Sequence, residues 1–349
     1  MKVFEMTDLG LMAYFLGVEI KQNEDNVFIC QKKYAQEILK KFHMEDSKVM
    51  STPMNQKENF SKDDGTEKVD EAYYRSLIGC LMYLTATRPD ILYAVSFLSR
   101  FMHCASDLHL RAAKRIVRYI KGIINYGVKF HKSQKFRLNG FSDSDWGGAP
   151  DMKSTSGFCF NLGSGAFSWY SKKQDIVAQS TAEAEFIAAT AAVNQALWLR
   201  KIMCDLNMKQ KEGTEVFIDN QAAISIANNP VFHAKTKHFN IKLFFLRDVQ
   251  KHGDVKLLYC KSDEQGFHIN FSGFHHSVLM ADICLRLWTV ERIFVCSTAL
   301  CVSSFLHRKQ RKDACHRKFR TVADKMIYNQ FPCGLCCRTY LPLYSSLKM

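Results

Sequence analysis

The sequence predicts an α/β fold in which a mixed five-stranded sheet with flanking helices follows a mostly helical region. Two observations lead to this prediction. Between residues 73 and 127, apolar side chains recur at every third or fourth position, which is typical of helices. From Phe136 onward, short apolar runs with Gly-containing turns give way to alternating helical and strand-like segments. Three strands followed by helix, strand, helix and strand form a sheet covered by helices.

The first 54 residues predict short strands followed by a helix. The runs 15–20 and 27–30 are apolar and β-branched and are separated by a polar turn. Apolar residues at helical spacing then occupy 34–42. Residues 55–72 are rich in Lys, Asp, Asn and Ser, with almost nothing to bury, so we expect a polar linker there.

The helical region, residues 73–135, contains one segment with two distinct faces. Between residues 110 and 124, apolar side chains occupy one side of the expected helix and basic side chains the other. A basic stripe at this spacing can follow a phosphate backbone, and it is equally typical of a solvated helix face. The residues that we assign to nucleic-acid binding are Arg111, Lys114, Arg115, Arg118 and Lys121.

Residues 136–265 supply the five strands of the predicted sheet. We expect strands at 136–143, 157–162, 166–169, 215–219 and 254–259, and helices at 180–206 and up to about 250. The long helix should begin at Ser180, because Ser180 and Glu183 match a capping box.

The composition changes after Gln265. Residues 266–349 hold 12 Lys and Arg against 4 Asp and Glu, and seven of the thirteen cysteines. Their apolar runs have no clear period. We therefore expect a basic, Cys-rich tail that is poorly ordered.

Charge and hydropathy narrow the classes of function. The net charge of +14 favours a polyanionic partner such as nucleic acid. Glu5 and Asp8 precede the first apolar stretch, where a secretory signal would carry positive charge. The uncharged run 293–306 is shorter than the roughly 20 residues of a membrane span. We expect a cytoplasmic or nuclear protein with reduced cysteines before residue 265.

Three acidic residues lie where metal-dependent hydrolysis would need them. Asp143 ends the first expected strand of the sheet, Asp219 ends the fourth, and Glu185 lies in the first turns of the long helix. Two divalent cations about 3.5–4 Å apart need rigidly held oxygen ligands of this kind. A single acid at a strand end is usually a solvated turn residue, so the prediction depends on the three together.

Five segments of this region resemble the RNase H domain of copia-type retrotransposon Pol polyproteins. In the order and spacing of that family, they are GFSDSDWGG (140–148), KSTSGFCF (153–160), FSWYSKKQ (167–174), QSTAEAEF (179–186) and DNQAA (219–223). Upstream, FEMTDLG (4–10) and FLGVEI (15–20) resemble the end of the reverse transcriptase region, and YRSLIG (74–79) and TRPDI (87–91) resemble its helical connection.

The resemblance implies an RNase H-like fold and Mg²⁺-dependent (or Mn²⁺-dependent) hydrolysis of the RNA strand of RNA–DNA hybrids. Asp143, Glu185 and Asp219 match the metal-binding carboxylates of the family. Glu183 and Asp145 are interpreted as a helix cap and a structural acid. The family's Asp-Asp polymerase signature would lie before Met1, so no polymerase activity is expected of these residues.

The family also has a fourth carboxylate shortly after the last strand, and this chain departs from the pattern there. Met280-Ala-Asp282-Ile resembles the missing segment but lies fifteen residues late, so Asp282 is a candidate substitute and chance is the alternative. The open alternative to catalysis is therefore an inactive retroelement remnant that binds nucleic acid. In either case, the rest of a Pol polyprotein is an expected partner.

Overall fold

The computed structural model describes residues 11–261, apart from residues 56, 57, 59, 133–135, 148–150 and 229–239. All of them belong to the first of two compact units, residues 1–291. The basic, Cys-rich segment 266–349, with Asp282, lies outside the described residues. The division into five segments at residues 54, 72, 135 and 265 stays a prediction.

The N-terminal sheet is antiparallel and has the order β1-β2-β3-β4. Its strands are β1 (Tyr14–Phe15), β2 (Val18–Gln22), β3 (Asn26–Cys30) and β4 (Gly127–His131). Of the two strands expected in this region, 27–30 is confirmed within β3, whereas 15–20 is divided by a turn at residues 16 and 17 between β1 and β2. β4 was not predicted, and its partner in β3 lies about 100 residues earlier in the chain, with Val27 opposite Phe130.

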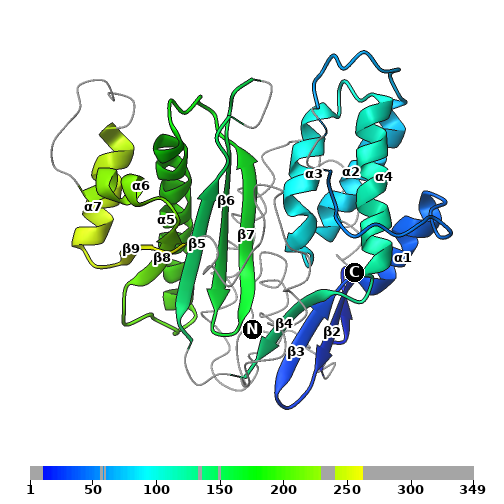
Figure 1. Ribbon diagram of the computed structural model, residues 1–349. Coiled ribbons are helices and arrows are strands. Elements are labelled where there is room, and N and C mark those ends of the chain that lie inside the picture. Colours follow the sequence, from blue (N-terminus) through cyan, green and yellow to red (C-terminus); the bar gives the residue numbers. More distant parts are fainter. Residues whose placement is uncertain are drawn as a thin grey trace, which may run out of the picture. The chain divides into compact units, whose positions relative to one another are not determined.

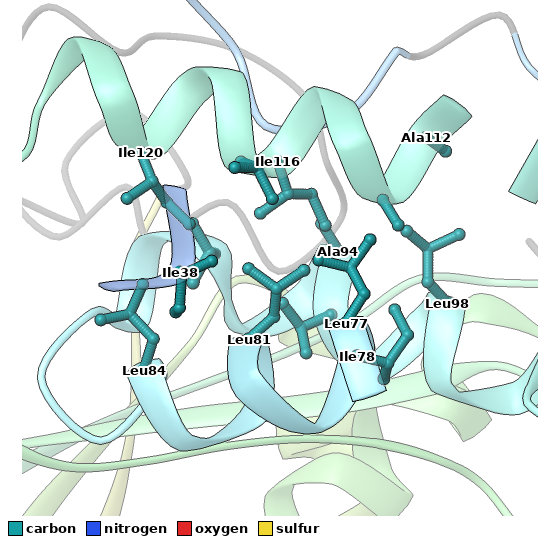
Figure 2. Close-up of a cluster of buried hydrophobic side chains, with 14 of the residues drawn as sticks. Ile38, Leu77, Ile78, Leu81, Leu84, Ala94, Leu98, Ala112, Ile116 and Ile120 are labelled. Carbon is teal, nitrogen blue, oxygen red and sulfur yellow. The ribbon is translucent and has the colours of Figure 1, made fainter. Parts of the chain in front are cut away.

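Four α-helices, one before residue 55 and three from the helical region, share one apolar core. They are α1 (Lys32–Lys41), α2 (Glu71–Leu84), α3 (Leu92–Leu98) and α4 (Asp107–Gly122), with 3₁₀ turns at Pro89–Ile91 and Ser99–Phe101. Figure 2 shows Ile38 of α1 beside leucines and isoleucines of α2, α3 and α4. Leu77, Leu81, Ile116 and Ile120 are all fully buried, which matches the helical spacing in the sequence.

The segment expected to be a polar linker contributes to this core. Phe60 is only 2% exposed and packs edge-on against Phe97. Asp64 accepts a hydrogen bond from the hydroxyl of Ser106, the residue before α4. The prediction that residues 55–72 have almost nothing to bury was wrong at Phe60, because one aromatic ring can anchor a polar stretch whose composition gives no helical or strand period.

The second sheet has five strands in the order β7-β6-β5-β8-β9. β5 pairs antiparallel with β6, β6 pairs antiparallel with β7, and β5-β8-β9 are parallel. The strands are β5 (Leu138–Ser144), β6 (Thr155–Leu162), β7 (Gly165–Lys173), β8 (Thr214–Ile218) and β9 (Val255–Tyr259). The predicted mixed five-stranded sheet is confirmed, with boundaries within about four residues of those expected.

Three helices accompany this sheet: α5 (Thr181–Asp205), α6 (Gln221–Asn228) and α7 (Asn240–Lys251). In Figure 1, α5 runs along the face of the sheet beside β5 and β8. Ala184, Ala188 and Ala192 of α5 are fully buried, and their small side chains allow the helix to approach the strands closely. This close approach places the start of α5 beside the ends of the central strands.

Two further properties of the described residues concern their cysteines and the length and hydropathy of their helices. Their six cysteines are free thiols, of which Cys30 and Cys159 are buried. None of their helices is both long enough and apolar enough to span a bilayer.

Candidate metal centre

Two neighbouring parallel strands bring Asp143 and Asp219 to the same edge of the sheet. Asp143 is the penultimate residue of β5, and Asp219 directly follows β8. The register pairs Ser142 with Ile218, so the two aspartates are the next residues along adjacent strands. Because parallel strands end at the same edge, their carboxyl ends are where ligands bind in open α/β sheets.

The third carboxylate comes from the start of α5. Ser180 caps this helix as expected, since its side chain accepts a hydrogen bond from the Glu183 N–H at 3.2 Å. The Glu183 carboxylate accepts from the Gln179 N–H at 2.9 Å, so Glu183 acts at the cap as predicted. Glu185, two residues further on, is only 5% exposed and lies on the side of the helix that faces the sheet.

Asp143, Glu185 and Asp219 form one cluster. Each offers a carboxylate oxygen, and the three oxygens all lie within 4.8 Å of one another. The backbone N–H of Ser144 donates to Glu185 Oε1 at 2.8 Å. Glu185 Oε2 is buried and has no hydrogen-bond partner among the residues that the structure describes. Carboxylate oxygens are hard metal ligands, and a buried carboxylate oxygen that accepts no hydrogen bond can bind a cation instead. The cluster therefore fits a divalent cation such as Mg²⁺.

Burial and the proximity of the three carboxyl groups disfavour the ionised forms of Asp143 and Glu185. Burial raises the pKa of Asp143 to about 6, and the nearby Asp219 adds to this effect. Burial also raises the pKa of Glu185 to about 10, reinforced by Asp143 and Asp219. A bound cation is the largest local charge in such a site and reverses these shifts.

Asp145 is a structural acid, as the sequence analysis assigned it. Its side chain accepts a hydrogen bond from the Thr155 N–H on the neighbouring strand β6. Burial raises the pKa of its carboxyl group. It is not one of the three residues whose oxygens gather in the cluster.

The structure gives four of the five basic residues of α4 an intramolecular partner. Arg115 donates to Thr52 O at 3.2 Å, Arg118 to Lys48 O at 2.6 Å, and Lys121 to Ser47 O at 2.7 Å. Arg111 pairs with Asp107 at 2.9 Å, and Lys114 is half-buried. Contacts of these five side chains with nucleic acid stay a prediction.

Two groups near the cluster were not singled out from the sequence. Ser144 orients Glu185 through its backbone N–H. The side-chain amide of Gln174 donates hydrogen bonds to Ser144 Oγ and to Ala184 O. The sequence signal for both was their place inside the matched segments, next to Asp143 and at the end of FSWYSKKQ. Asp282, the candidate fourth ligand, lies outside the described residues.

Comparison with known sequences identifies similar proteins over most of the described chain. A family model described as reverse transcriptase (RNA-dependent DNA polymerase) matches residues 1–56. The retrovirus-related Pol polyprotein from transposon RE1 of Arabidopsis thaliana is 35% identical over 263 residues, 75% of this chain and 18% of the relative. The Pol polyprotein from transposon TNT 1-94 of Nicotiana tabacum is 36% identical over 273 residues, 75% of this chain and 20% of the relative.

A shorter relative is matched over most of its own length. An uncharacterized mitochondrial protein of Arabidopsis thaliana is 42% identical over 197 residues, 56% of this chain and 81% of the relative. The chain therefore spans about a fifth of the length of the Pol polyproteins that it matches, and most of this shorter protein.

Among solved structures, two similar chains cover different shares of the molecule. RNase H1 from the halophilic archaeon Halobacterium salinarum NRC-1 covers 36% of this chain and 87% of its own, with 14% identity and a TM-score of 0.28. A foamy viral protease-reverse transcriptase in complex with double-stranded DNA covers 71% of this chain and 37% of its own, with 13% identity and a TM-score of 0.40.

The sequence relatives agree with the resemblance on which the sequence analysis drew. They extend over about three quarters of the chain. The chain belongs to the family of copia-type retrotransposon Pol polyproteins.

Proposed function

We propose that the domain built on the five-stranded sheet hydrolyses the RNA strand of RNA–DNA hybrids in a metal-dependent reaction. The observation that carries this proposal is the gathering of Asp143, Glu185 and Asp219, with carboxylate oxygens within 4.8 Å of one another. Family membership supports it, because the matched segments are those of the retrotransposon RNase H region.

The three carboxylates would hold the cations from two rigid strands and one helix. Two bound Mg²⁺ ions, or Mn²⁺ ions, would supply an activated water and stabilise the leaving 3′ oxygen. The chain itself contributes the spacing of the ligands. Asp143 and Asp219 are fixed by the register of β5 and β8, and the Ser144 N–H keeps one oxygen of Glu185 in place, leaving the other for the cation.

The proposed partner is an RNA–DNA hybrid. A net charge of +14 favours binding to its phosphates, and contacts with 2′-hydroxyl groups would distinguish the RNA strand. The rest of a Pol polyprotein is the second proposed partner, and the cytoplasm or nucleus the proposed location.

The alternative is a chain that binds hybrids without cutting them. The same positive charge supports binding, and the departure from the family pattern after Gln265 leaves the fourth carboxylate without a direct match. This alternative predicts salt-dependent binding with no product.

One experiment distinguishes the two functions. A hybrid labelled on the RNA strand is incubated with the full chain and Mg²⁺, and both binding and product are followed. We expect cleavage that is abolished in Asp219→Asn and in Glu185→Gln. Glu183→Gln is the matched control on the same helix, because Glu183 lies outside the cluster. Binding without product by the unsubstituted chain would establish the alternative.

A further inference from the structure

We propose that Gln174 is a positioning residue for the metal centre, whose side-chain amide holds the end of β5, with Asp143, against the start of α5, with Glu185. This role rests on the proposed function, because it concerns the same carboxylate site. Gln174 directly follows β7 and is only 6% exposed. Its backbone N–H donates to Ser154 O at 2.7 Å, which fixes the main chain beside the start of β6.

The side-chain amide of Gln174 joins three elements of the fold. Its Nε2 lies within hydrogen-bond distance of Ser144 Oγ at 3.1 Å, Ser156 Oγ at 2.9 Å and Ala184 O at 3.0 Å. These acceptors belong to β5, β6 and α5, three elements that are labelled in Figure 1. An amide nitrogen has two hydrogens, so three acceptors share two donors.

The acceptors fix which way the amide points. The carbonyl oxygen of Ala184 can only accept a hydrogen bond, so a reversed amide would place two oxygens against each other. In the observed orientation, Gln174 Oε1 is buried with no hydrogen-bond partner among the described residues. An acceptor left unused in the interior is costly, and the donor contacts of Nε2 are what this orientation gains.

Two of these contacts, to Ser144 and to Ala184, lead to a chain neighbour of a carboxylate. Ser144 follows Asp143 in the chain, and its backbone N–H donates to Glu185 Oε1 at 2.8 Å. Ala184 directly precedes Glu185. Gln174 thus acts on the ligands through the residues beside them, and it connects the strand end and the helix start to one rigid amide.

The cluster needs such a connection because a divalent cation binds oxygen ligands that are held at a fixed spacing, and the three carboxylate oxygens come from separate elements and lie within 4.8 Å of one another. Without the amide, the start of α5 could move away from β5, and the three oxygens would lose the spacing that a divalent cation requires.

The test measures metal affinity rather than activity. Gln174→Met preserves the length and volume of the side chain and removes its donors. We expect the affinity of the full chain for Mn²⁺, measured by titration calorimetry, to fall by about 10- to 100-fold, the range typical of groups that orient metal ligands.

The matched control is Gln210→Met. The Gln210 amide also bridges backbone groups, since it donates to Phe136 O at 2.9 Å and accepts from the Leu138 N–H at 3.1 Å. These contacts lie at the opposite end of β5 from Asp143. Gln210→Met should lower stability while leaving Mn²⁺ affinity within about twofold of the unsubstituted chain, because the ligands at the other end of the strand keep their support.

Folding is checked by circular dichroism, and Gln174→Asn, one methylene shorter and still an amide, replaces Gln174→Met if that variant does not fold. The proposal is supported if the variant at position 174 binds Mn²⁺ weakly while Gln210→Met binds it with normal affinity. Equal Mn²⁺ affinities in the unsubstituted chain and the position-174 variant would overturn the positioning role of Gln174 and leave the proposed function standing. An equal loss of Mn²⁺ affinity in both glutamine variants would have the same consequence. If the unsubstituted chain does not bind Mn²⁺, the proposed function itself fails.

Discussion

At the scale of single residues, Glu185 carries the largest electrostatic cost in the site. Its carboxyl group is almost completely buried beside Asp143 and Asp219, and its pKa rises to about 10 from an ordinary value near 4.5. Between these two values, the folded chain retains a proton that the unfolded chain has released. The metal-free protein must therefore lose stability as pH rises from about 4.5 towards 10.

Glu185→Gln should stabilise the metal-free protein at pH 8. Glutamine has no proton to release on unfolding, so the pH-dependent cost at this position disappears. We expect a gain of about 1 kcal/mol or more in the free energy of unfolding at pH 8, since a pKa raised by one corresponds to about 1.4 kcal/mol. Urea denaturation in EDTA at pH 8 and pH 4 measures it.

The difference between Glu185→Gln and the unsubstituted chain should almost vanish at pH 4, where the glutamate is protonated in both states. A gain of the same size at both pH values would mean that the charge of Glu185 is not its cause. Glu183→Gln, on the same helix but outside the cluster, should show no comparable gain at pH 8.

Single residues also mark the limit of what the sequence could predict. Asp143, Glu185 and Asp219 were predicted because they end strands or begin a helix inside matched segments, and the structure brings them together. Gln174 and Ser144 were not, because their contacts depend on the packing of β5, β6 and α5.

At the scale of elements, the basic side chains of α4 include two pairs with different surroundings. Arg115 and Arg118 donate to backbone oxygens of the segment 47–52, and this ties the segment to the helix. Arg111 lies on the exposed part of the same helix, and Lys114 is half-buried beside it. Substituting Arg115 with Arg118, and separately Arg111 with Lys114, therefore distinguishes a structural role of the basic stripe from contact with phosphates.

Arg111→Gln combined with Lys114→Gln should weaken binding to an RNA–DNA hybrid while leaving the fold intact. If both residues contact phosphates, the slope of log affinity against log salt concentration should decrease by about 1.8, or about 0.9 per lost contact. Fluorescence anisotropy at several salt concentrations measures this slope. An unchanged slope would identify the stripe as a solvated face.

Arg115→Gln combined with Arg118→Gln should act mainly on stability. Hydrogen bonds from charged donors contribute about 1.5–3 kcal/mol each, and these two side chains hold the segment 47–52. We expect a lower free energy of unfolding and faster proteolysis within residues 47–52. Unchanged stability together with a lower salt slope would show that these arginines face the nucleic acid instead.

The start of α4 gives a prediction about the segment 55–72. The Ser106 hydroxyl donates to the Asp64 carboxylate, and this hydrogen bond is the main reason why the pKa of Asp64 is lowered to about 2. Ser106→Ala should cost about 1–2 kcal/mol at pH 7 and speed up proteolysis near Asp64. Ser99→Ala, which removes only a local bond to Ser96 O, should not affect that cleavage.

The pH dependence of the Ser106→Ala effect follows from the lowered pKa. The stabilisation is fully present above the unfolded value near 3.8 and is lost as pH falls towards 2. The difference in unfolding free energy between Ser106→Ala and the unsubstituted chain should therefore be smaller at pH 3 than at pH 7. A constant difference would assign the effect to the helix cap alone.

Elements were predictable where their pattern is local. The apolar spacing of α2 and α4 and the short runs of β5 to β9 were sufficient to place them. β4 was missed because its partner β3 lies about 100 residues away, and the buried side of Phe60 was missed because one ring has no period. Both depend on contacts between distant parts of the chain, which single-sequence patterns do not contain.

At the scale of the whole molecule, metal binding should be coupled to folding. The unfolded chain has no preformed cluster, so a cation that binds the folded state stabilises it by RT ln(1 + [L]/Kd), about 2.7 kcal/mol at one hundred times Kd. The same cation competes with protons for Asp143 and Glu185, whose pKa values are raised to about 6 and about 10.

Mg²⁺ should therefore raise the melting temperature of the full chain more at pH 8 than at pH 5.5. At pH 5.5 both carboxyl groups are largely protonated and the cation must displace two protons, whereas at pH 8 Asp143 is already ionised. Differential scanning calorimetry with Mg²⁺ or with EDTA measures the shift, and Asp219→Asn should reduce it at both pH values. A shift that is independent of pH, or that persists in Asp219→Asn, would place the stabilising cation elsewhere on the chain, because only binding at this cluster is linked to the protons of Asp143 and Glu185.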